Sequence, residues 1–125
     1  MRVNRRTFLQ STAATAAAGM FSSSAWAEDP INVASIHDLS GGLDIYGKPM
    51  VDAMTLAVEE ANAAGGLLGR QIKLINYDPQ SNMQLYTQFA QQAALKDKVA
   101  VVMGGITSAS REVIRPVLDR ARPRC

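Results

Sequence analysis

The stretch VAVVMGGITSAS at residues 99–110 decides the fold of this chain. Its first five residues, 99–103, are continuously apolar, which predicts a parallel strand buried on both faces of a sheet. Gly104 and Gly105 end that strand, and the hydroxyl-bearing residues after them predict the start of a helix. The apolar stripe of this helix consists of Ile114, Val117, Leu118 and Ala121.

The same order of strand and helix is predicted for residues 31–66. Residues 31–36 are rich in Ile and Val and predict a strand, and residues 39–47 carry three glycines and predict a loop. A helix is predicted from Lys48, with Pro49 in its first turn, and it ends at the paired glycines of residues 62–66. Its apolar stripe consists of Met50, Ala53, Met54, Ala57, Val58 and Ala61.

A second strand and helix complete the pattern. Residues 72–78 predict a strand, and Asn82 is placed to cap the helix that follows. The apolar stripe of that helix consists of Tyr86, Phe89, Ala90, Ala93 and Ala94. Three strands that alternate with three helices predict an α/β fold, a three-layer parallel sheet with helices on both faces. Ligands of such sheets bind at the carboxyl ends of the strands, which selects the loops at residues 38–47 and 104–110.

The first 27 residues have the layout of an export signal. A basic start is followed by a mildly apolar middle and by a small-residue end in which Ala25 and Ala27 form an A-x-A cleavage site. The middle is too short and too polar to remain as a membrane anchor. Arg5 and Arg6, followed by a polar residue, Phe and Leu, resemble the twin-arginine signal of bacteria; the alternative is a general secretory signal. The mature chain is therefore expected to begin near Glu28, to work in the periplasm and to keep no integral membrane segment.

Charge and cysteine usage exclude several classes of protein. The 13 basic and 11 acidic residues of the 125-residue chain give a net charge of +2, too weak to predict a nucleic-acid partner. All of that excess lies in the signal, since residues 28–125 carry a net charge of −1. The single cysteine, Cys125, forms no internal disulfide, redox pair or cysteine metal site.

The loop at residues 104–110 offers the best candidate binding groups. Two glycines let a ligand approach the backbone, and three hydroxyl groups stand at a helix start, where free N–H groups favour a carboxylate or an amide oxygen. The alternative is that Ser108 or Ser110 caps the helix, and the two roles are compatible. Tyr46 in the other loop is placed either to contact a ligand or to pack on the following helix.

Catalytic and cofactor motifs are not found. No GxGxxG follows the first strand and no GxxxxGK[ST] occurs, so no nucleotide cofactor is predicted. His37 beside Asp38 suggests a base and its orienting group, but without a nucleophile elbow a satisfied or ligand-facing histidine is favoured. The four aspartates at positions 38, 44, 52 and 78 lack metal-loop spacing. We therefore expect neither an enzyme nor a metal site nor a cofactor.

Taken together, these motifs resemble one family. The features are the loop Leu-Ser-Gly-Gly-x-x-x-Tyr-Gly at 39–47, the helix end EEANAAGG at 59–66, a strand ending in Tyr77-Asp78, and Gly-x-Thr-Ser-Ala-Ser at 105–110. Over residues 31–122 the chain is similar to the periplasmic substrate-binding proteins of ABC transporters, in the branch for branched-chain amino acids, amides and urea. The stretch TSASR at 107–111 resembles the urea and short-amide members more than the leucine members.

The resemblance implies a function and a set of contacts. A protein of this family captures a small polar solute between two lobes and delivers it to ABC permease subunits in the inner membrane. Its first-lobe ligand contacts correspond to Tyr46, Thr107 and Ser108, with Gly105 and Ser110 as further candidates. Two alternatives stay open: a periplasmic amide-sensing module, and an enzyme exported by the twin-arginine route.

The length of the chain departs from that family. Its members are several times longer than the 98 residues that follow the signal, so residues 28–125 are expected to form an incomplete N-terminal lobe of a ligand-binding domain. A truncated binding protein of this kind is expected not to close on a ligand.

Overall fold

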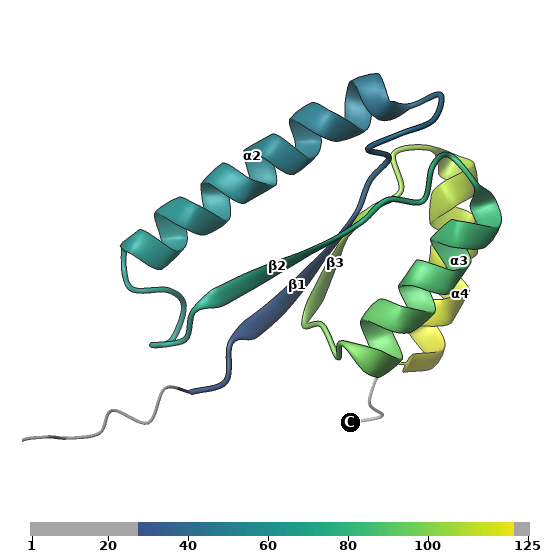
Figure 1. Cartoon of the computed structure of the whole chain (residues 1–125). Coiled ribbons are helices and arrows are strands. Elements are labelled where there is room, and N and C mark those ends of the chain that lie inside the picture. The colour runs from purple at the N-terminus through teal and green to yellow at the C-terminus, as the bar shows by residue number, and fades with distance from the viewer. Residues whose placement is uncertain (1–27, 122–125) are drawn as a thin grey trace, which may run out of the picture.

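The computed structural model describes residues 28–121 as one α/β unit (Figure 1). The signal residues Arg5, Arg6, Ala25 and Ala27 and the cysteine at position 125 lie outside the described residues. The elements in chain order are β1 (Ile31–Ile36), α2 (Asp44–Ala63), β2 (Ile72–Tyr77), α3 (Met83–Gln91), a π-helical turn η1 (Gln92–Lys96), β3 (Val101–Gly104) and α4 (Ser108–Ala121).

The three strands form one parallel sheet in the order β2-β1-β3. The register pairs Ile31 with Ile72 and Val33 with Val101, so β1 lies in the centre. Helix α2 covers one face of the sheet and α3 and α4 cover the other (Figure 1). The predicted fold class, a parallel sheet between helices, is confirmed.

The hydrophobic core lies between the sheet and the α3–α4 pair. Its fully or almost fully buried members are Ala34, Ile36, Tyr77, Tyr86, Ala90, Ala93 and Ile114. The predicted stripes of the second and third helices are therefore the faces that pack on the sheet. The Tyr77 and Phe89 rings lie 5.3 Å apart between centroids and join β2 to α3 within this core.

Helix ends follow the sequence where capping residues are present. The Asn82 side chain accepts hydrogen bonds from the backbone of Gln84 at 2.8 Å and Leu85 at 3.4 Å, as predicted for an N-cap. After α2, Gly66 has a φ of 77° and donates its N–H to the carbonyl of Ala61 at 2.8 Å. Among the described residues no helix is both long and apolar enough to cross a membrane.

The prediction that the third strand is buried on both faces is wrong. Strand β3 lies at the edge of the sheet and is shorter than the apolar run, beginning only at Val101. Val101 and Met103 are 51% and 48% exposed. Helix α2 packs mainly on β2, at the opposite edge, and so leaves this side of β3 uncovered. A continuous apolar run indicates a parallel strand but does not indicate how many neighbours cover it.

The predicted start of the first helix is also wrong. Helix α2 begins at Asp44, so Tyr46 and Gly47 lie in its first turns rather than in a loop, and Pro49 is inside the helix. Gly47 is buried, and a Cβ atom there would overlap the carbonyl oxygen of Asp38. This glycine lets the helix approach the end of β1, a packing role that resembles a loop signal in the sequence.

The packed face of α2 agrees with the predicted apolar stripe only in part, since Met54, Val58 and Ala61 are half-buried. Val51 is buried, whereas Met50 is 39% exposed and Ala53 and Ala57 are exposed. The helix turns a mixed face, including the half-buried Thr55, toward the sheet, and the Thr55 hydroxyl donates to the Val51 carbonyl at 2.8 Å. Alanines fit either face of a helix, so periodicity alone did not identify the packed side.

Candidate functional site

The carboxyl ends of the three strands meet at the end of the sheet where α2, α3 and α4 begin (Figure 1). Both loops selected from the sequence lie there. A third loop, residues 78–82 between β2 and α3, shares this end and is hydrogen-bonded to the loop after β1. The sequence did not predict this third loop as part of the site.

Asp78 holds the loop after β1 against the end of β2. Its Oδ1 accepts hydrogen bonds from the backbone N–H groups of Leu39 at 3.0 Å and Ser40 at 3.3 Å, and its Oδ2 accepts from Ser40 Oγ at 2.7 Å. The Gln80 N–H also donates to Oδ1 at 3.1 Å. Burial alone raises the pKa of this carboxyl, but the hydrogen bonds from Ser40, Leu39 and Gln80 outweigh it and hold the pKa below its usual value.

Asp38 makes the reciprocal connection. Its side chain is buried, and its two oxygens accept from the backbone N–H of Ser81 at 2.8 Å and from Ser81 Oγ at 3.1 Å. The Leu43 N–H donates to the same Ser81 hydroxyl at 3.2 Å. Asp38 and Asp78, whose spacing gave no metal loop in the sequence, therefore join the ends of β1 and β2 through hydrogen bonds.

The loop after β3 is closed by a cap at the start of α4. The Ser110 N–H donates to Thr107 Oγ1 at 3.1 Å, and the Thr107 N–H donates to Ser110 Oγ at 3.2 Å. This is a reciprocal N-terminal cap in which Thr107 is the capping residue. The alternative in which Ser108 or Ser110 caps this helix is wrong for the N-cap itself, which is Thr107. Ser110 takes part because its hydroxyl accepts the Thr107 N–H.

Ser108 remains the most available hydroxyl of this loop. It is exposed, and its N–H lies in the first turn of α4, where no intrahelical acceptor exists. It lines a cavity of about 480 Å³ between β3 and α4. Thr107 and Ser110 bond to each other, so Ser108 carries the most exposed hydroxyl of the three.

Gly105 is more constrained than its loop position suggests. It is buried with a φ of 73°, a backbone conformation that favours glycine, and the Arg111 side chain packs against it. Its N–H donates to the Ile36 carbonyl at 3.3 Å, so that donor is occupied by β1.

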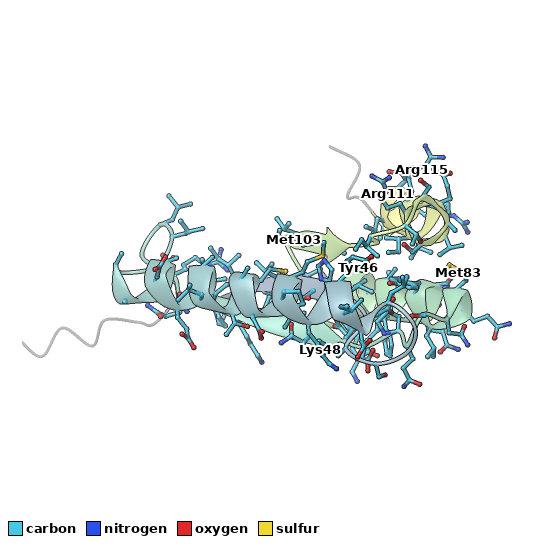
Figure 2. All side chains as sticks on the ribbon, turned by 90° about the horizontal axis from the view of Figure 1, so that it is seen from above. Tyr46, Lys48, Met83, Met103, Arg111 and Arg115 are labelled. Atoms are coloured by element: carbon cyan, nitrogen blue, oxygen red, sulfur yellow. The ribbon has the colours of Figure 1, made fainter. Side chains whose placement is uncertain are left out.

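Tyr46 lies in the first turn of α2 and is 55% exposed. Figure 2 places it at the same end of the molecule as the start of α4 that carries Arg111. The 480 Å³ cavity is lined by Ser108 and not by Tyr46 or Thr107. The described residues therefore bring the predicted contacts to one end of the sheet without enclosing them in one pocket.

His37 is a buried histidine with a hydrogen-bond partner at Nδ1. It is 8% exposed, and its Nδ1 lies 2.9 Å from the hydroxyl of the buried Ser35. Burial lowers the pKa of the imidazole, while the neighbouring Asp38 carboxylate acts in the opposite direction. Its burial and its contact with Ser35 favour a structural role for His37.

Tyr86 belongs to the predicted apolar stripe of the second helix, although its side chain carries a polar hydroxyl. It is fully buried, and its hydroxyl has no hydrogen-bond partner among the described residues. Burial, and then the nearby Asp38, raise the pKa of the phenol well above its usual value, while Ser110 acts in the opposite direction. The phenol thus lies near Asp38, which follows β1, and near Ser110, in the first turn of α4. Within residues 28–121 no three His, Cys, Asp or Glu side chains gather as a metal site.

Comparisons with known proteins agree on one family. Residues 31–123 match the model of the periplasmic binding protein domain, and residues 2–22 match the model of the twin-arginine translocation pathway signal sequence, which confirms the predicted export route. The chain is 30% identical over 95 residues to Leu/Ile/Val-binding protein homolog 7 of Brucella melitensis, a match that covers 76% of this chain and 24% of that protein.

Solved structures give the same relationship. The substrate-binding protein LivJ of a branched-chain amino acid transporter from Streptococcus pneumoniae, in complex with isoleucine, has a TM-score of 0.71 and 29% identity and covers 74% of this chain and 26% of its own. The leucine-binding protein LivK from Thermotoga maritima has a TM-score of 0.67 and 25% identity, covering 73% of this chain and 25% of its own. The chain thus spans about a quarter of the length of the relatives it matches.

Proposed function

Since the chain belongs to the periplasmic binding protein domain family and carries a twin-arginine signal for export to the periplasm, we propose that it supplies the first-lobe side of a solute-binding site of an ABC importer. The signal occupies residues 1–27 in this proposal, and residues 28–125 form an incomplete N-terminal lobe. The partners are a small polar solute and, through a complete protein, the permease subunits in the inner membrane.

One observation carries this proposal: a free hydroxyl and free first-turn N–H groups stand together at the carboxyl edge of a parallel sheet. Ser108 provides both, at the positive end of the α4 dipole. A carboxylate or an amide oxygen is the ligand group that such donors favour. The Thr107–Ser110 cap fixes the direction of these donors before any ligand arrives, which lowers the entropy cost of binding.

Tyr46 contributes a different kind of contact in this proposal. Its ring is half exposed on the opposite element, α2, so it can stack on an apolar part of the solute or donate from its hydroxyl. Gly105 contributes shape rather than a donor, because its N–H is bonded to Ile36. The relatives named for Leu, Ile and Val favour a branched-chain amino acid, and the TSASR stretch favours an amide or urea. The proposed solutes therefore include branched-chain amino acids as well as amides and urea.

A chimera tests the proposal on a complete protein. The 95-residue region of the Brucella melitensis relative is replaced by the corresponding residues of this chain, and isoleucine, leucine, valine, acetamide and urea are titrated calorimetrically. We expect saturable binding of at least one solute. A folded chimera that binds none, while its parent binds one of them, contradicts the proposal.

Paired variants of the chimera test the named residues. Ser108→Ala removes one hydrogen bond to a polar or charged solute group and should weaken binding by about tenfold or more. Ser110→Ala instead removes the hydrogen bonds between the Ser110 hydroxyl and the backbone of Thr107. It should therefore lower the midpoint of thermal unfolding more than it lowers affinity. Equal affinities for the parent chimera and Ser108→Ala would remove Ser108 from the site.

A further inference from the structure

The side chain of Arg70 is bound to the backbone that follows the signal. Its Nε donates to the carbonyl oxygen of Asp29 at 2.7 Å, and its Nη2 lies 3.5 Å from the carbonyl oxygen of Pro30. Pro30 immediately precedes β1, at the end of the sheet opposite to the candidate site (Figure 1). Arg70 is half-buried, and neither of the ion pairs within residues 28–121 involves it. Its donors are therefore directed to the backbone before β1 rather than to a carboxylate.

A tight turn fixes the backbone of Arg70. Leu67 and Arg70 exchange two backbone hydrogen bonds, of 2.9 and 2.8 Å, across the two residues between them. Those residues, Leu68 and Gly69, have φ values of 53° and 75°, as in the turns that close hairpins. At Gly66 a Cβ atom would overlap the Arg70 carbonyl oxygen, so the close approach requires glycine there. The position of Arg70 is therefore set by the turn and not by its contact with Asp29.

The same turn is joined to α2 and to the sheet. The Asn62 side chain, in the last turn of α2, accepts the Ile72 N–H at 2.7 Å and donates to the Ile72 carbonyl at 2.8 Å. The Ile31 N–H donates to the Gln71 carbonyl at 2.8 Å, which joins the first residue of β1 to the end of the turn. The hydrogen-bonded unit therefore begins at Asp29, before the sheet itself.

The expected end of the signal lies next to this contact. In the proposed function the signal ends at Ala27, so the bond that a signal peptidase cleaves joins Ala27 to Glu28, one residue before Asp29. The twin-arginine route carries folded proteins, so these contacts exist when the signal is removed. Proteins that recognise an extended peptide bind its main-chain groups. The peptidase and Arg70 therefore compete for the same short stretch of backbone.

We propose that Arg70 slows removal of the signal, because it holds residues 29–30 on the folded domain and must release them before the peptidase binds. The inference rests on the proposed function, which ends the signal at Ala27. Hydrolysis adds one water across the amide between Ala27 and Glu28: the C–N bond breaks, Ala27 gains a carboxylate and Glu28 an ammonium group. Where opening is fast compared with cleavage, the cleavage rate follows the population of the open form. Loss of the Arg70 contact raises that population.

Cleavage of the purified precursor, residues 1–125, by a bacterial signal peptidase in detergent tests the proposal. Arg70→Ala removes a charge-assisted hydrogen bond and should raise the initial rate of cleavage by about threefold or more. Arg70→Lys keeps the charge without the forked geometry and should give an intermediate rate. Lys73→Ala, at an exposed position of β2, is the matched control for the loss of one positive charge and should leave the rate unchanged.

A further variant separates the Arg70 contact from the stability of the whole domain. Phe89→Ala removes a ring that packs on Tyr77 in the core, far from residues 29–30 in the chain, so it should lower the urea midpoint without raising the cleavage rate. Unchanged or slower cleavage in Arg70→Ala would overturn the proposal, and so would an equal acceleration in Phe89→Ala. The mass of the mature chain tests the proposed function separately, because a product that does not begin at Glu28 contradicts the signal boundary whatever the rates are.

Discussion

The β1–β2 half of the sheet and the β3 edge differ in how completely their polar groups are hydrogen-bonded and their side chains are covered. Asp38 and Asp78 join the ends of β1 and β2 through hydrogen bonds to two loops, and α2 packs closely over that half. In the part of the chain that the structure describes, strand β3 pairs with β1 alone, and Val101 and Met103 are half exposed. Hydrogen bonds therefore hold the loops at the ends of β1 and β2 together, whereas the strand that leads into the loop at 104–110 lies at an open edge.

The largest effect is expected where α2 touches the end of β1. Gly47→Val places side-chain atoms where the Asp38 carbonyl lies and should destabilise the chain by about 3 kcal/mol or abolish folding. The measurement is urea unfolding followed by circular dichroism. Gly42→Val is the matched control, because a Cβ at Gly42 meets nothing within 4 Å. Equal losses for the two variants would mean that the close approach of α2 is not what holds this half together.

The next largest effect is expected at the buried Asp38. Asp38→Ala leaves the N–H and hydroxyl of Ser81 without their acceptor and should cost about 2 kcal/mol. Asp52→Ala, at an exposed position on α2, serves as the control and should change stability by less than about 0.5 kcal/mol. The same unfolding measurement applies, and a loss at Asp38 no larger than that at Asp52 would contradict the framework.

The pH dependence of stability should report on Asp78. Its pKa is lower in the folded chain than in the unfolded chain, so its contribution is present above the unfolded value, about 4, and is lost as the pH falls through the folded pKa. Urea midpoints measured between pH 5 and about pH 2 should therefore fall less steeply in Asp78→Asn than in the parent chain. Parallel curves for the two proteins would show that this carboxylate is not held by its hydrogen bonds.

A smaller effect, of opposite sign, is expected at Tyr86. Its buried hydroxyl has no hydrogen-bond partner within residues 28–121, so Tyr86→Phe should leave stability unchanged or raise it by about 1 kcal/mol. Tyr86→Ala, which empties the same core position, should cost about 4 kcal/mol and shows that the measurement is sensitive. A loss above about 1 kcal/mol in Tyr86→Phe would indicate that the hydroxyl is bonded in solution.

The smallest effect on stability is expected at the open edge. Met103→Lys places a charge on an exposed edge position and should change the unfolding free energy by less than about 0.5 kcal/mol. It should also reduce aggregation, measured by light scattering, because a lysine on an edge opposes strand addition. Ala34→Lys, at the fully buried centre of β1, is the contrasting variant and should not fold.

The sequence predicted the fold class because its local signals agreed. Alternating strands and helices, the Asn82 cap and the glycines after α2 all indicated the same element order. The errors arose at residues whose type is compatible with two different local structures. Gly47 is a packing glycine inside a helix, and the apolar run before Gly104 forms an edge strand whose exposure depends on helices elsewhere in the fold.

The candidate site was predictable in its position but not in its internal bonding. Strand ends in a parallel sheet indicate where ligands bind, and this rule selected the loops that contain Tyr46 and Ser108. The reciprocal cap of Thr107 with Ser110 and the Asp38–Ser81 contact join residues whose side-chain directions depend on the folded backbone. The unpaired hydroxyl of Tyr86 was hidden because tyrosine counts as apolar in a helical pattern.

The most direct test of the central claim is a thermal-shift titration of the purified periplasmic chain itself with isoleucine, leucine, acetamide and urea. Because these residues supply one side of a solute site in the proposed function, we expect no saturable rise in unfolding temperature up to millimolar solute. The chimera, titrated in parallel, should show such a rise. A saturable shift in the chain alone would mean that residues 28–125 already make a complete site and would contradict the account.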